Sequence, residues 1–409
     1  MIEDIASRAG VSRATLYQYF ESKEAIFLEL IQDGGADFLS LARTARPLGP
    51  DRQGFESLRS WLSDWSAEVD RYSTLFVEWG NVNSRKAPLR PRLAWFVERH
   101  TAVWAKRLTE AGFEGLSAEA MALLMLAVTD RYNYSRLVFR PAASEAALVD
   151  NLAVAFQLAL FPETRRGAFV SVDGHAVRPV AEAARRRRAP TRRAKGRPTP
   201  LPVRDVFAGL SDQAAGTVRQ LLDAAGKVFA NNGYAASNVD LIVTEAGLAR
   251  GTFYKYFTVK SELLATLTLE CAAEMGSALR DLVAVGGASE RGAALRKWLT
   301  GFLRIQHTYS AVLRAWTERQ PDEPAIMDAN YEIVATLTSS VTKLLALSGR
   351  TERLDVGATT MMLAALLERF PEESAGTRYQ LSEAEVVEAQ AVFIERVLMG
   401  PERRKRSPH

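Results

Sequence analysis

Basic, aromatic and small polar side chains alternate along residues 250–260, a combination that suits contact with a DNA groove. Small side chains at Gly251 and Thr252 let the start of a helix approach the groove closely, where its free amides and its dipole favour phosphate. Thr252 also offers a hydroxyl and a methyl group to base edges. The other candidate contacts in this segment are Arg250, Tyr254, Lys255, Tyr256 and Lys260. We expect the two tyrosines and Lys260 to hold the sugar-phosphate backbone.

Three short helices are needed to position these side chains, and the sequence predicts them within residues 217–264. Apolar residues of the first helix recur at helical spacing, at Val218, Leu221, Leu222, Ala225, Val228 and Phe229. A second helix is predicted over 238–246, and Gly247 permits the positive φ that a helix-turn-helix corner requires. In the third helix, Phe253 and Phe257 lie four residues apart and can anchor it to its neighbours. The candidate contacts are then left to face outward.

The run LARGTFYKYF at 248–257, followed by KSELL from Lys260, resembles the DNA-binding end of TetR/AcrR-type transcriptional regulators. In that family the third helix enters the major groove, and the next helix begins at a lysine that contacts phosphate. The resemblance therefore implies these roles for the third helix and for Lys260. The alternative is an aromatic-rich three-helix core that does not bind DNA. The combined register of turn, aromatic residues and lysine disfavours that alternative.

The same pattern stands at the start of the chain. Residues 2–31 align without a gap onto residues 239–268. The candidate DNA contacts of this first copy are Arg13, Ala14, Thr15, Tyr17, Gln18, Tyr19 and Lys23. Gln18 stands where the later copy has Lys255, so we expect the two copies to read different half-sites.

The two copies also differ at the residues that precede their helices. Ser12 and Ser22 can each cap the helix that follows, because a serine hydroxyl accepts a hydrogen bond from a free backbone amide. Ala249 and Val259 hold the matching positions in the later copy and have no such oxygen.

The first copy has no counterpart of residues 217–237, the segment expected to cover the turn, because Met1 aligns with Asn238. We expect either a start site further upstream or a unit that has lost its first helix. In the second case the apolar side of Ile5 and Leu16 would be exposed, and the head would be loosely held.

Similarity continues beyond these heads. Residues 73–79 align with 310–316 in the same register, and residues 145–161 align with 383–399 after a shift by a single position. We therefore predict an all-α fold with two tandem TetR-like units, called repeats below, each a helix-turn-helix head with a helical bundle for ligand binding and dimerisation. The predicted segments are a first head (1–32, without its first helix), a first regulatory domain (33–162), a basic Pro/Arg-rich linker (163–210), a second head (211–271), a second regulatory domain (272–400) and a basic tail (401–409).

The positive charge is concentrated in the linker. The chain has a formal charge of +4, and residues 185–197 hold eight basic residues and no acid, so the remainder carries about −4. A focused basic segment is typical of a nucleic-acid binder. Within it, Arg193, Lys195, Gly196 and Arg197 resemble a minor-groove AT-hook. The alternative is a solvated, flexible tether.

Composition indicates an ordinary folded protein. The chain has 409 residues, of which 47% are hydrophobic and 24% are charged, and this length allows two or three domains. The single cysteine, Cys271, is expected to be a small core residue, with a thiol sensor as the alternative. No basic-then-apolar leader begins the chain, and the longest apolar runs are too short to span a bilayer. We expect a cytoplasmic protein with no membrane partner.

Enzyme function is disfavoured, because the sequence shows no Gly-rich phosphate loop, no metal-ligand cluster and no nucleophile triad. We expect no cofactor and no metal. His100 and His307 are isolated, with no second ligand at helical spacing, and are expected to be structural or exposed.

Tryptophans mark the predicted bundles. In TetR-type proteins the equivalent helices enclose an effector pocket, so the resemblance implies a small apolar or aromatic effector. The candidate pocket residues are Trp79, Trp104, Trp298 and Trp316, and each has the simpler role of filling a core as its alternative.

The last two helices of each repeat are apolar on broad faces, and in this family such helices form a four-helix dimer interface. We predict that the two repeats pair within one chain around a pseudo-two-fold axis, with a further homodimer possible. The predicted function is a ligand-responsive regulator, most often a repressor in this family, that binds a double-stranded DNA operator. In the alternative, only the second head binds DNA and the first repeat is a partnering module.

Overall fold

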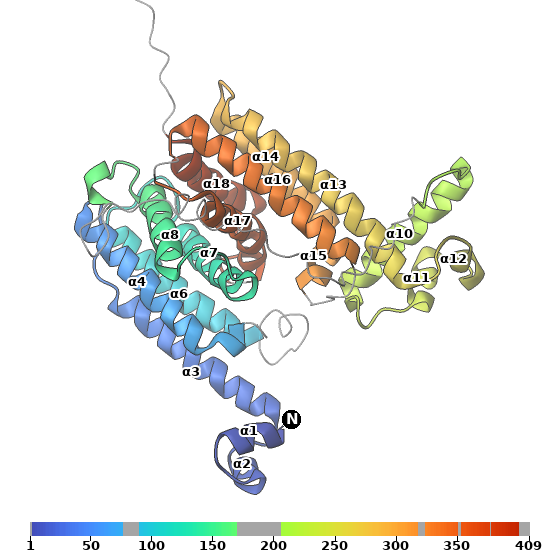
Figure 1. Cartoon of the computed structure of the whole chain (residues 1–409), viewed down its shortest axis with the longest axis horizontal. Helices are drawn as coiled ribbons and strands as arrows, with labels where there is room; N and C mark the ends of the chain where they lie inside the picture. The colour runs from blue at the N-terminus through green and yellow to red at the C-terminus, as the bar shows by residue number, and fades with distance from the viewer. Residues whose placement is uncertain are drawn as a thin grey trace, which may run out of the picture. The chain divides into compact units, whose positions relative to one another are not determined.

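The computed structural model describes residues 2–76, 90–169, 206–317, 324–350, 353–376 and 378–400. Every regular element in these ranges is helical (Figure 1), which confirms the predicted all-α class. The chain folds as two compact units, the first made of Met1–Val177 and Ala365–Leu381 and the second of Arg178–Ala364 and Ser382–His409. Ala365–Leu381 therefore folds with the first unit, although we expected it within the second regulatory domain.

The first compact unit is built on long helices that follow a small head. Its helices are α1 (Ile2–Arg8), α2 (Arg13–Tyr19), α3 (Lys23–Thr44), α4 (Arg52–Arg71), α6 (Arg90–Glu110), α7 (Ala118–Phe139) and α8 (Glu145–Leu160), with the 3₁₀ turn η1 (Arg166–Ala168). α3 runs unbroken through the expected boundary at residue 32, so one helix joins the head to its bundle. α6 packs on α7, and α4 packs on α8.

Helix α7 is enclosed on all its faces over residues 120–129, where every side chain is buried. This stretch reads AMALLMLAVT and has no polar stripe, as a helix buried all round requires. The polar residues Asp130 and Arg131 follow directly, so the helix passes from a dry core to a charged region within one turn.

The second compact unit repeats this plan. Its helices are α10 (Asp212–Asn232), α11 (Val239–Ala246), α12 (Arg250–Tyr256), α13 (Lys260–Gly286), α14 (Arg291–Thr308), α15 (Ser310–Thr317), α16 (Pro324–Ser348), the first part of α17 (Val356–Gly376), α18 (Glu383–Ile394) and the π-helical turn η2 (Glu395–Met399). α13 packs along α14 and α16, and α14 packs on α18. α13 also runs unbroken through the expected boundary at residue 271.

The order of helices recurs along the chain in the register of the sequence repeat. α2 and α12 begin at aligned arginines, Arg13 and Arg250, and α3 and α13 begin at aligned lysines, Lys23 and Lys260. α17 and α18 likewise begin at the positions that align with the starts of α7 and α8. Helix α10 precedes the second head and has no counterpart among the described residues of the first.

Cys271 lies in the core of the second unit, as expected. Its side chain is fully buried in α13, with the Sγ atom 3.6 Å from Sδ of Met275. Burial raises the pKa of the thiol to about 12, so it stays protonated and unreactive at neutral pH.

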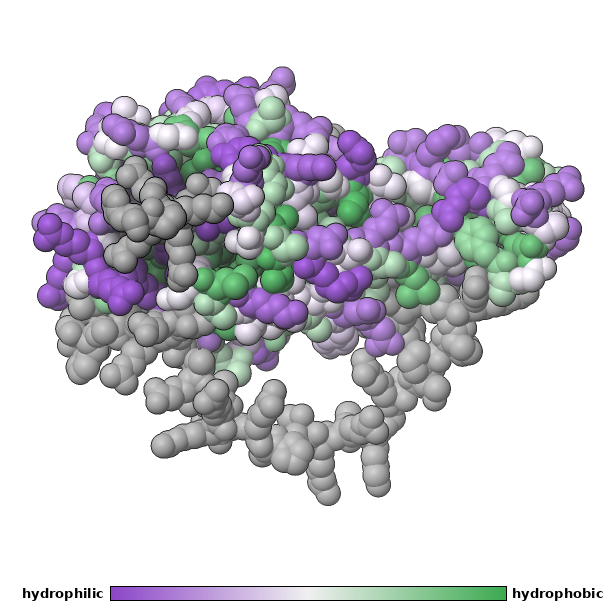
Figure 2. Space-filling view, turned by 90° about the horizontal axis from the view of Figure 1, so that it is seen from above, coloured by the Kyte–Doolittle hydropathy of each residue, from purple (hydrophilic) through white to green (hydrophobic). Residues whose placement is uncertain are grey.

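The surface is mainly polar on the face shown in Figure 2, where apolar side chains form small patches. Across the described ranges, no helix combines the length and the apolar content that crossing a membrane demands.

Candidate DNA-binding heads and an aromatic cavity

The second head is held together by the apolar residues that the sequence indicated. All six predicted core residues of α10 are buried, and so are Phe253 and Phe257 of the third helix, whose ring centroids lie 5.8 Å apart. Asn238 caps α11 by accepting a hydrogen bond from the amide of Leu241, at 2.9 Å. Gly247 ends α11 with a φ of 65°, as the helix-turn-helix corner requires. These anchors fix which side of α12 faces away from the core.

The outward side of α12 carries most of the predicted DNA contacts. Gly251 and Lys255 are exposed, Tyr254 is 52% exposed, and Thr252 and Tyr256 are half-buried. The exposed ring and hydroxyl of Tyr254 are available to a partner surface. The other cation of the helix is Arg250, its first residue, and it is already paired with an acid of α11.

Arg250 forms an exposed ion pair with Asp240 of α11, with 2.9 Å between Nη1 and Oδ1. Its guanidinium also lies over the ring of Tyr254, 5.9 Å from the centroid. These contacts raise the pKa of Arg250, the hydrogen bond to Tyr254 most and the charge of Asp240 next. The arginine is thus held in place at the start of the recognition helix.

Lys260 faces inward in this structure. Its Nζ atom donates hydrogen bonds to the carbonyl oxygens of Tyr234, at 2.9 Å, and Ser237, at 2.7 Å, and lies 4.4 Å from the centroid of the Tyr234 ring. Burial lowers the pKa of its amine. Two of its three N–H donors are used, which leaves one for a phosphate. Nothing in the residue pattern indicated this role, because both acceptors are backbone atoms of the α10–α11 connection.

The first head has the serine caps that the sequence predicted. The hydroxyl of Ser12 accepts from the amide of Thr15 at 3.0 Å, and that of Ser22 accepts from the amide of Ala25 at 3.1 Å. In the second head neither α12 nor α13 has a side-chain cap from its N-cap residue, which confirms the predicted difference. There, Glu262 accepts instead from the amide of Thr258 at 2.7 Å.

Helix α2 of the first head presents a surface like that of α12. Tyr17 is 43% exposed and Tyr19 is 77% exposed. The other predicted contacts of this head are exposed or, for Thr15, half-buried: Arg13, Ala14, Thr15, Gln18 and Lys23. Arg13 pairs with Glu3 at 2.7 Å and lies 5.5 Å from the centroid of the Tyr17 ring, the same arrangement as in the second head.

The apolar side of the first head is covered although no α10-like helix is present among its described residues. Leu16 is only 7% exposed and Ile5 is half-buried, so the exposure expected for a unit without its first helix is absent at Leu16. α1 packs directly on α2, and Ala6 of α1 is buried as well.

Several predicted site residues fall outside the described part of the chain. These are the arm residues Arg193, Lys195, Gly196 and Arg197, and also Trp79. Trp316 belongs to α15, but its side chain is also outside the description.

Trp104 and Trp298 are core residues. Trp104 is fully buried, with its ring centroid 4.3 Å from that of Trp61. Trp298 stacks on Phe302 at 5.1 Å and donates from Nε1 to the carbonyl of Ala278 at 2.6 Å. Both therefore take the simpler of the two predicted roles.

His100 lies in the same aromatic core as Trp104. It is fully buried, and neither ring nitrogen has a hydrogen-bond partner in the described part of the chain. Its ring centroid lies 5.2 Å from that of Trp65. Burial lowers its pKa to about 3, so it is a neutral packing residue at physiological pH.

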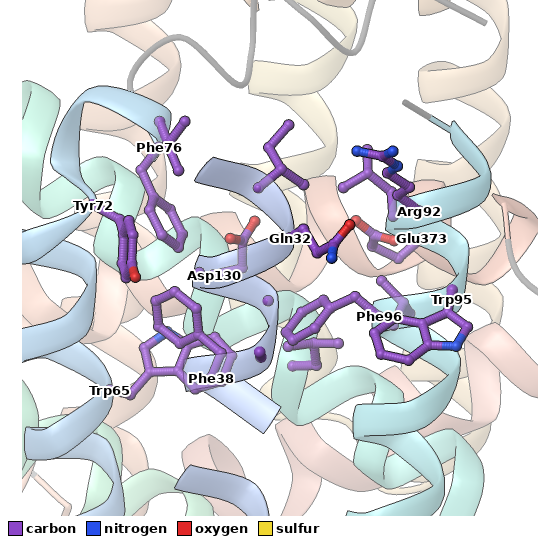
Figure 3. Close-up of a pocket in the computed structure, with 18 of the residues that line it drawn as sticks. Gln32, Phe38, Trp65, Tyr72, Phe76, Arg92, Trp95, Phe96, Asp130 and Glu373 are labelled. Carbon is purple, nitrogen blue, oxygen red and sulfur yellow. The ribbon is translucent and has the colours of Figure 1, made fainter. Parts of the chain in front are cut away.

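A cavity of about 540 Å³ lies in the first compact unit (Figure 3). Its lining combines aromatic, small and charged side chains from α3, α6, α7, the end of α4 and the part of α17 that belongs to this unit. The lining residues used below are Phe38, Trp65, Tyr72, Phe76, Trp95, Phe96, Gln32, Arg92, Asp130, Arg369 and Glu373. Trp104 does not line it. The sequence marked the aromatic residues of this bundle, Trp65 and Trp95 among them, but not which of them line a cavity, because helical spacing alone does not show which side of a helix is hollow.

The charged end of the cavity joins α7 to α17. Arg369 forms ion pairs with Glu373, with Glu372 at 2.8 Å and with Asp130 at 3.8 Å. Beside it, Arg131 binds Glu368 through two hydrogen bonds of 2.6 and 3.2 Å.

These two contacts are reciprocal in the sequence repeat. Asp130 and Arg131 of α7 align with Glu368 and Arg369 of α17, in the register that also aligns α8 with α18. Each arginine therefore pairs with the acid that matches its own neighbour. The sequence signal that could have indicated these contacts is the acid-arginine dipeptide at the end of each apolar run, Asp-Arg in α7 and Glu-Arg in α17.

A buried apolar anchor, a glycine corner and an exposed short helix with a basic first residue define the class of helix-turn-helix DNA-binding domains. Residues 1–30 and 221–267 both match the family model described as bacterial regulatory proteins, tetR family. The two heads of this chain are therefore TetR-type DNA-binding domains.

Relatives are similar over part of the chain. It is 47% identical over 51 residues to the fatty acid metabolism regulator protein of Bacillus subtilis (strain 168), a match that covers 12% of this chain and 26% of that protein. The match thus spans about a quarter of that relative's length.

Three solved structures that are similar to this chain each cover 45% of it. They are a putative TetR-family transcriptional regulator from Mesorhizobium loti MAFF303099 (20% identity, 96% of that chain, TM-score 0.36), the TetR-family regulator PfmR from Thermus thermophilus (20%, 100%, 0.36) and a putative fatty acid metabolism regulator from Clostridium perfringens (18%, 100%, 0.33).

Proposed function

We propose that this chain is a cytoplasmic transcriptional regulator, acting as a repressor, that binds a double-stranded DNA operator through two non-identical heads. The observation that carries the proposal is the shared surface of α2 and α12. In each, an arginine ion-paired to the preceding helix is followed two residues later by a threonine and four residues later by an exposed tyrosine. Gln18 and Lys255 differ at one exposed position, so the two half-sites should differ as well.

We also propose that the two repeats form a pseudo-dimer within one chain. The recurring order of helices, in the register of the sequence repeat, supports a tandem duplication. The reciprocal pairs Arg131–Glu368 and Arg369–Asp130 support a two-fold relation between α7 and α17, because an isologous contact joins residue i to j and residue j to i. A single chain would then offer both heads to one operator, and a further homodimer could join two such chains.

The cavity supports a ligand-responsive mechanism. Its volume of about 540 Å³ and its aromatic lining are those of a site for a small apolar or aromatic effector. We propose that effector binding changes how well the heads fit their half-sites, because the major-groove half-sites of such operators have a fixed spacing.

Tyrosine variants of each head test the DNA-binding proposal. Tyr17→Ala and Tyr254→Ala should each weaken binding to the operator about tenfold, because each removes a large side chain from the contact surface. The measurement is fluorescence anisotropy of the full chain titrated onto DNA that flanks its own gene. Tyr331→Ala is the matched control, since Tyr331 is 60% exposed on α16, outside the heads.

The pattern of effects separates the two candidate functions. Loss of affinity in Tyr254→Ala alone would support the alternative in which only the second head binds DNA and the first repeat is a partnering module. Equal binding by all three variants would contradict both. Scrambling each half of a mapped operator in turn also separates the two functions: if both heads bind DNA, either change should lower the affinity of the chain for the operator.

A further inference from the structure

We propose that the cavity of the first compact unit binds a cationic amphiphile, an apolar body that carries a quaternary or protonated amine held at Asp130 and Glu373. The inference rests on the proposed ligand-responsive function, and it adds the chemical class of the effector. It follows from the walls of the cavity, from the charges at its charged end and from the pairing of each charge.

The walls are aromatic on several sides. The ring of Phe38 packs among three other rings, 4.5 Å from that of Trp65, 5.5 Å from that of Phe76 and 6.5 Å from that of Phe96, measured between centroids. The faces of aromatic rings carry negative electrostatic potential and attract cations as well as apolar groups. In Figure 3 the aromatic side chains stand to both sides of the cavity, with Asp130, Gln32 and Glu373 between them.

The charges at the charged end of the cavity do not balance. Arg131 and Glu368 satisfy each other through two hydrogen bonds. Of the groups that remain at this end, Arg369, Asp130 and Glu373 line the cavity, whereas Glu372, which also pairs with Arg369, is 64% exposed and does not line it. With all groups ionised, this part of the cluster has an excess of negative charge, which an added cation would offset.

Asp130 is the least satisfied of these acids. Its closest cation is Nε of Arg369, 3.8 Å away, which is too long for a hydrogen bond, and no donor in the described part of the chain hydrogen-bonds its carboxylate. Its side chain is 27% exposed and that of Glu373 is 18% exposed. Burial raises the pKa of both carboxyl groups, and the charge of Arg369 opposes that shift.

An anionic amphiphile finds no comparable partner there. Arg369 is already engaged by three acids, and Arg131 by one. Arg92 also lines the cavity; it is exposed and donates to the carbonyl of Leu28 at 3.2 Å. A carboxylate placed beside Asp130 and Glu373 would meet more negative than positive charge, so we expect it to bind more weakly than a neutral molecule of the same length.

The position of Glu373 links this site to the rest of the chain. It lies on α17, whose residues Val356–Ala364 belong to the second compact unit and whose later residues belong to the first. A cation held by Glu373 therefore contacts a helix that is shared by both units, which gives effector binding a direct covalent route to the second repeat.

Three probes with one alkyl chain and different head groups test the inference. Decyltrimethylammonium, 1-decanol and decanoate are titrated calorimetrically into the full chain, each below its micelle concentration. We expect the cation to bind about tenfold more tightly than the alcohol, in line with an ion pair and ring contacts in a partly buried site, and decanoate to bind most weakly. Equal affinities, a preference for decanoate or no binding of any probe would overturn the inference.

Two variants assign the effect to the acids. Asp130→Asn and Glu373→Gln should each lower the affinity for decyltrimethylammonium about five- to tenfold and leave that for decanol unchanged. Asp64→Asn, which removes an exposed acid from α4 outside the cavity, is the matched control. Circular dichroism checks folding, and if one variant unfolds, the other and the probe comparison still decide. Unchanged affinity in both variants would overturn the inference.

The same titrations keep the two proposals apart. If the cation binds as expected but leaves operator affinity unchanged, the ligand class stands and the ligand-responsive function fails. If decanoate alone releases the operator, the function stands and the cationic class is wrong.

Discussion

At the scale of single residues, the arginine that begins each recognition helix is ion-paired to an acid, and this acid competes with DNA phosphate for the guanidinium. Glu3 pairs with Arg13 at 2.7 Å and Asp240 pairs with Arg250 at 2.9 Å, and all four side chains are exposed. Exposed pairs contribute little to stability, so phosphate can displace the acid readily. The acid nevertheless adds a negative charge close to the DNA backbone.

Removing that acid should strengthen DNA binding. We expect Glu3→Gln and Asp240→Asn each to raise operator affinity about two- to fivefold and to steepen its logarithmic salt dependence by about one, because one more arginine is free to neutralise phosphate. Anisotropy titrations at several salt concentrations measure both. Asp64→Asn loses the same charge outside the heads, and an equal gain in that variant would attribute the effect to net charge instead.

At the scale of elements, the heads differ in how their recognition helices start. Ser12 has φ −71° and ψ 153°, and Ala249 has φ −75° and ψ 147°, so the backbone is alike at both positions, although the amide of Thr252 already donates to the carbonyl of Ala249 at 2.9 Å. Ser12→Ala should destabilise α2 by about 1 kcal/mol, and Ala249→Ser should stabilise α12 by up to a similar amount. Hydrogen exchange of the amides in α2 and α12 reports each helix separately. An unchanged α12 in Ala249→Ser would mean that the hydroxyl prefers water to the amide of Thr252.

Elements are also where sequence and structure agree best. Helix boundaries near Gly247 and the caps at Ser12 and Ser22 could be predicted, because glycine corners, caps and apolar spacing are local properties of the chain. The inward hydrogen bonds of Lys260 could not, since they end on backbone carbonyls more than twenty residues away. The cavity could not be predicted either, because Glu373 meets α7 only through tertiary packing.

At the scale of the whole molecule, the reciprocal pairs connect the sequence repeat to the way one chain could present two heads. Arg131 and Glu368 are the better-formed pair, with side chains 19% and 40% exposed. Arg131→Glu should lower the free energy of unfolding by about 1–2 kcal/mol, since a charged hydrogen-bonded pair is lost and two acids are brought together at a partly exposed site. The charge swap Arg131→Glu with Glu368→Arg should recover most of that loss.

The decisive measurement for the pseudo-dimer is the dependence on operator length. If pairing of α7 with α17 holds the two repeats together, Arg131→Glu should weaken binding to DNA with both half-sites, whereas its affinity for DNA with one half-site should match that of the unaltered chain. The swap should restore the two-half-site affinity, because spacing is then re-established without touching either head. Equal losses on both DNAs would place the effect on the heads themselves. Unchanged affinity for both DNAs would mean that the α7–α17 contact plays no part in DNA recognition and that the two heads act independently.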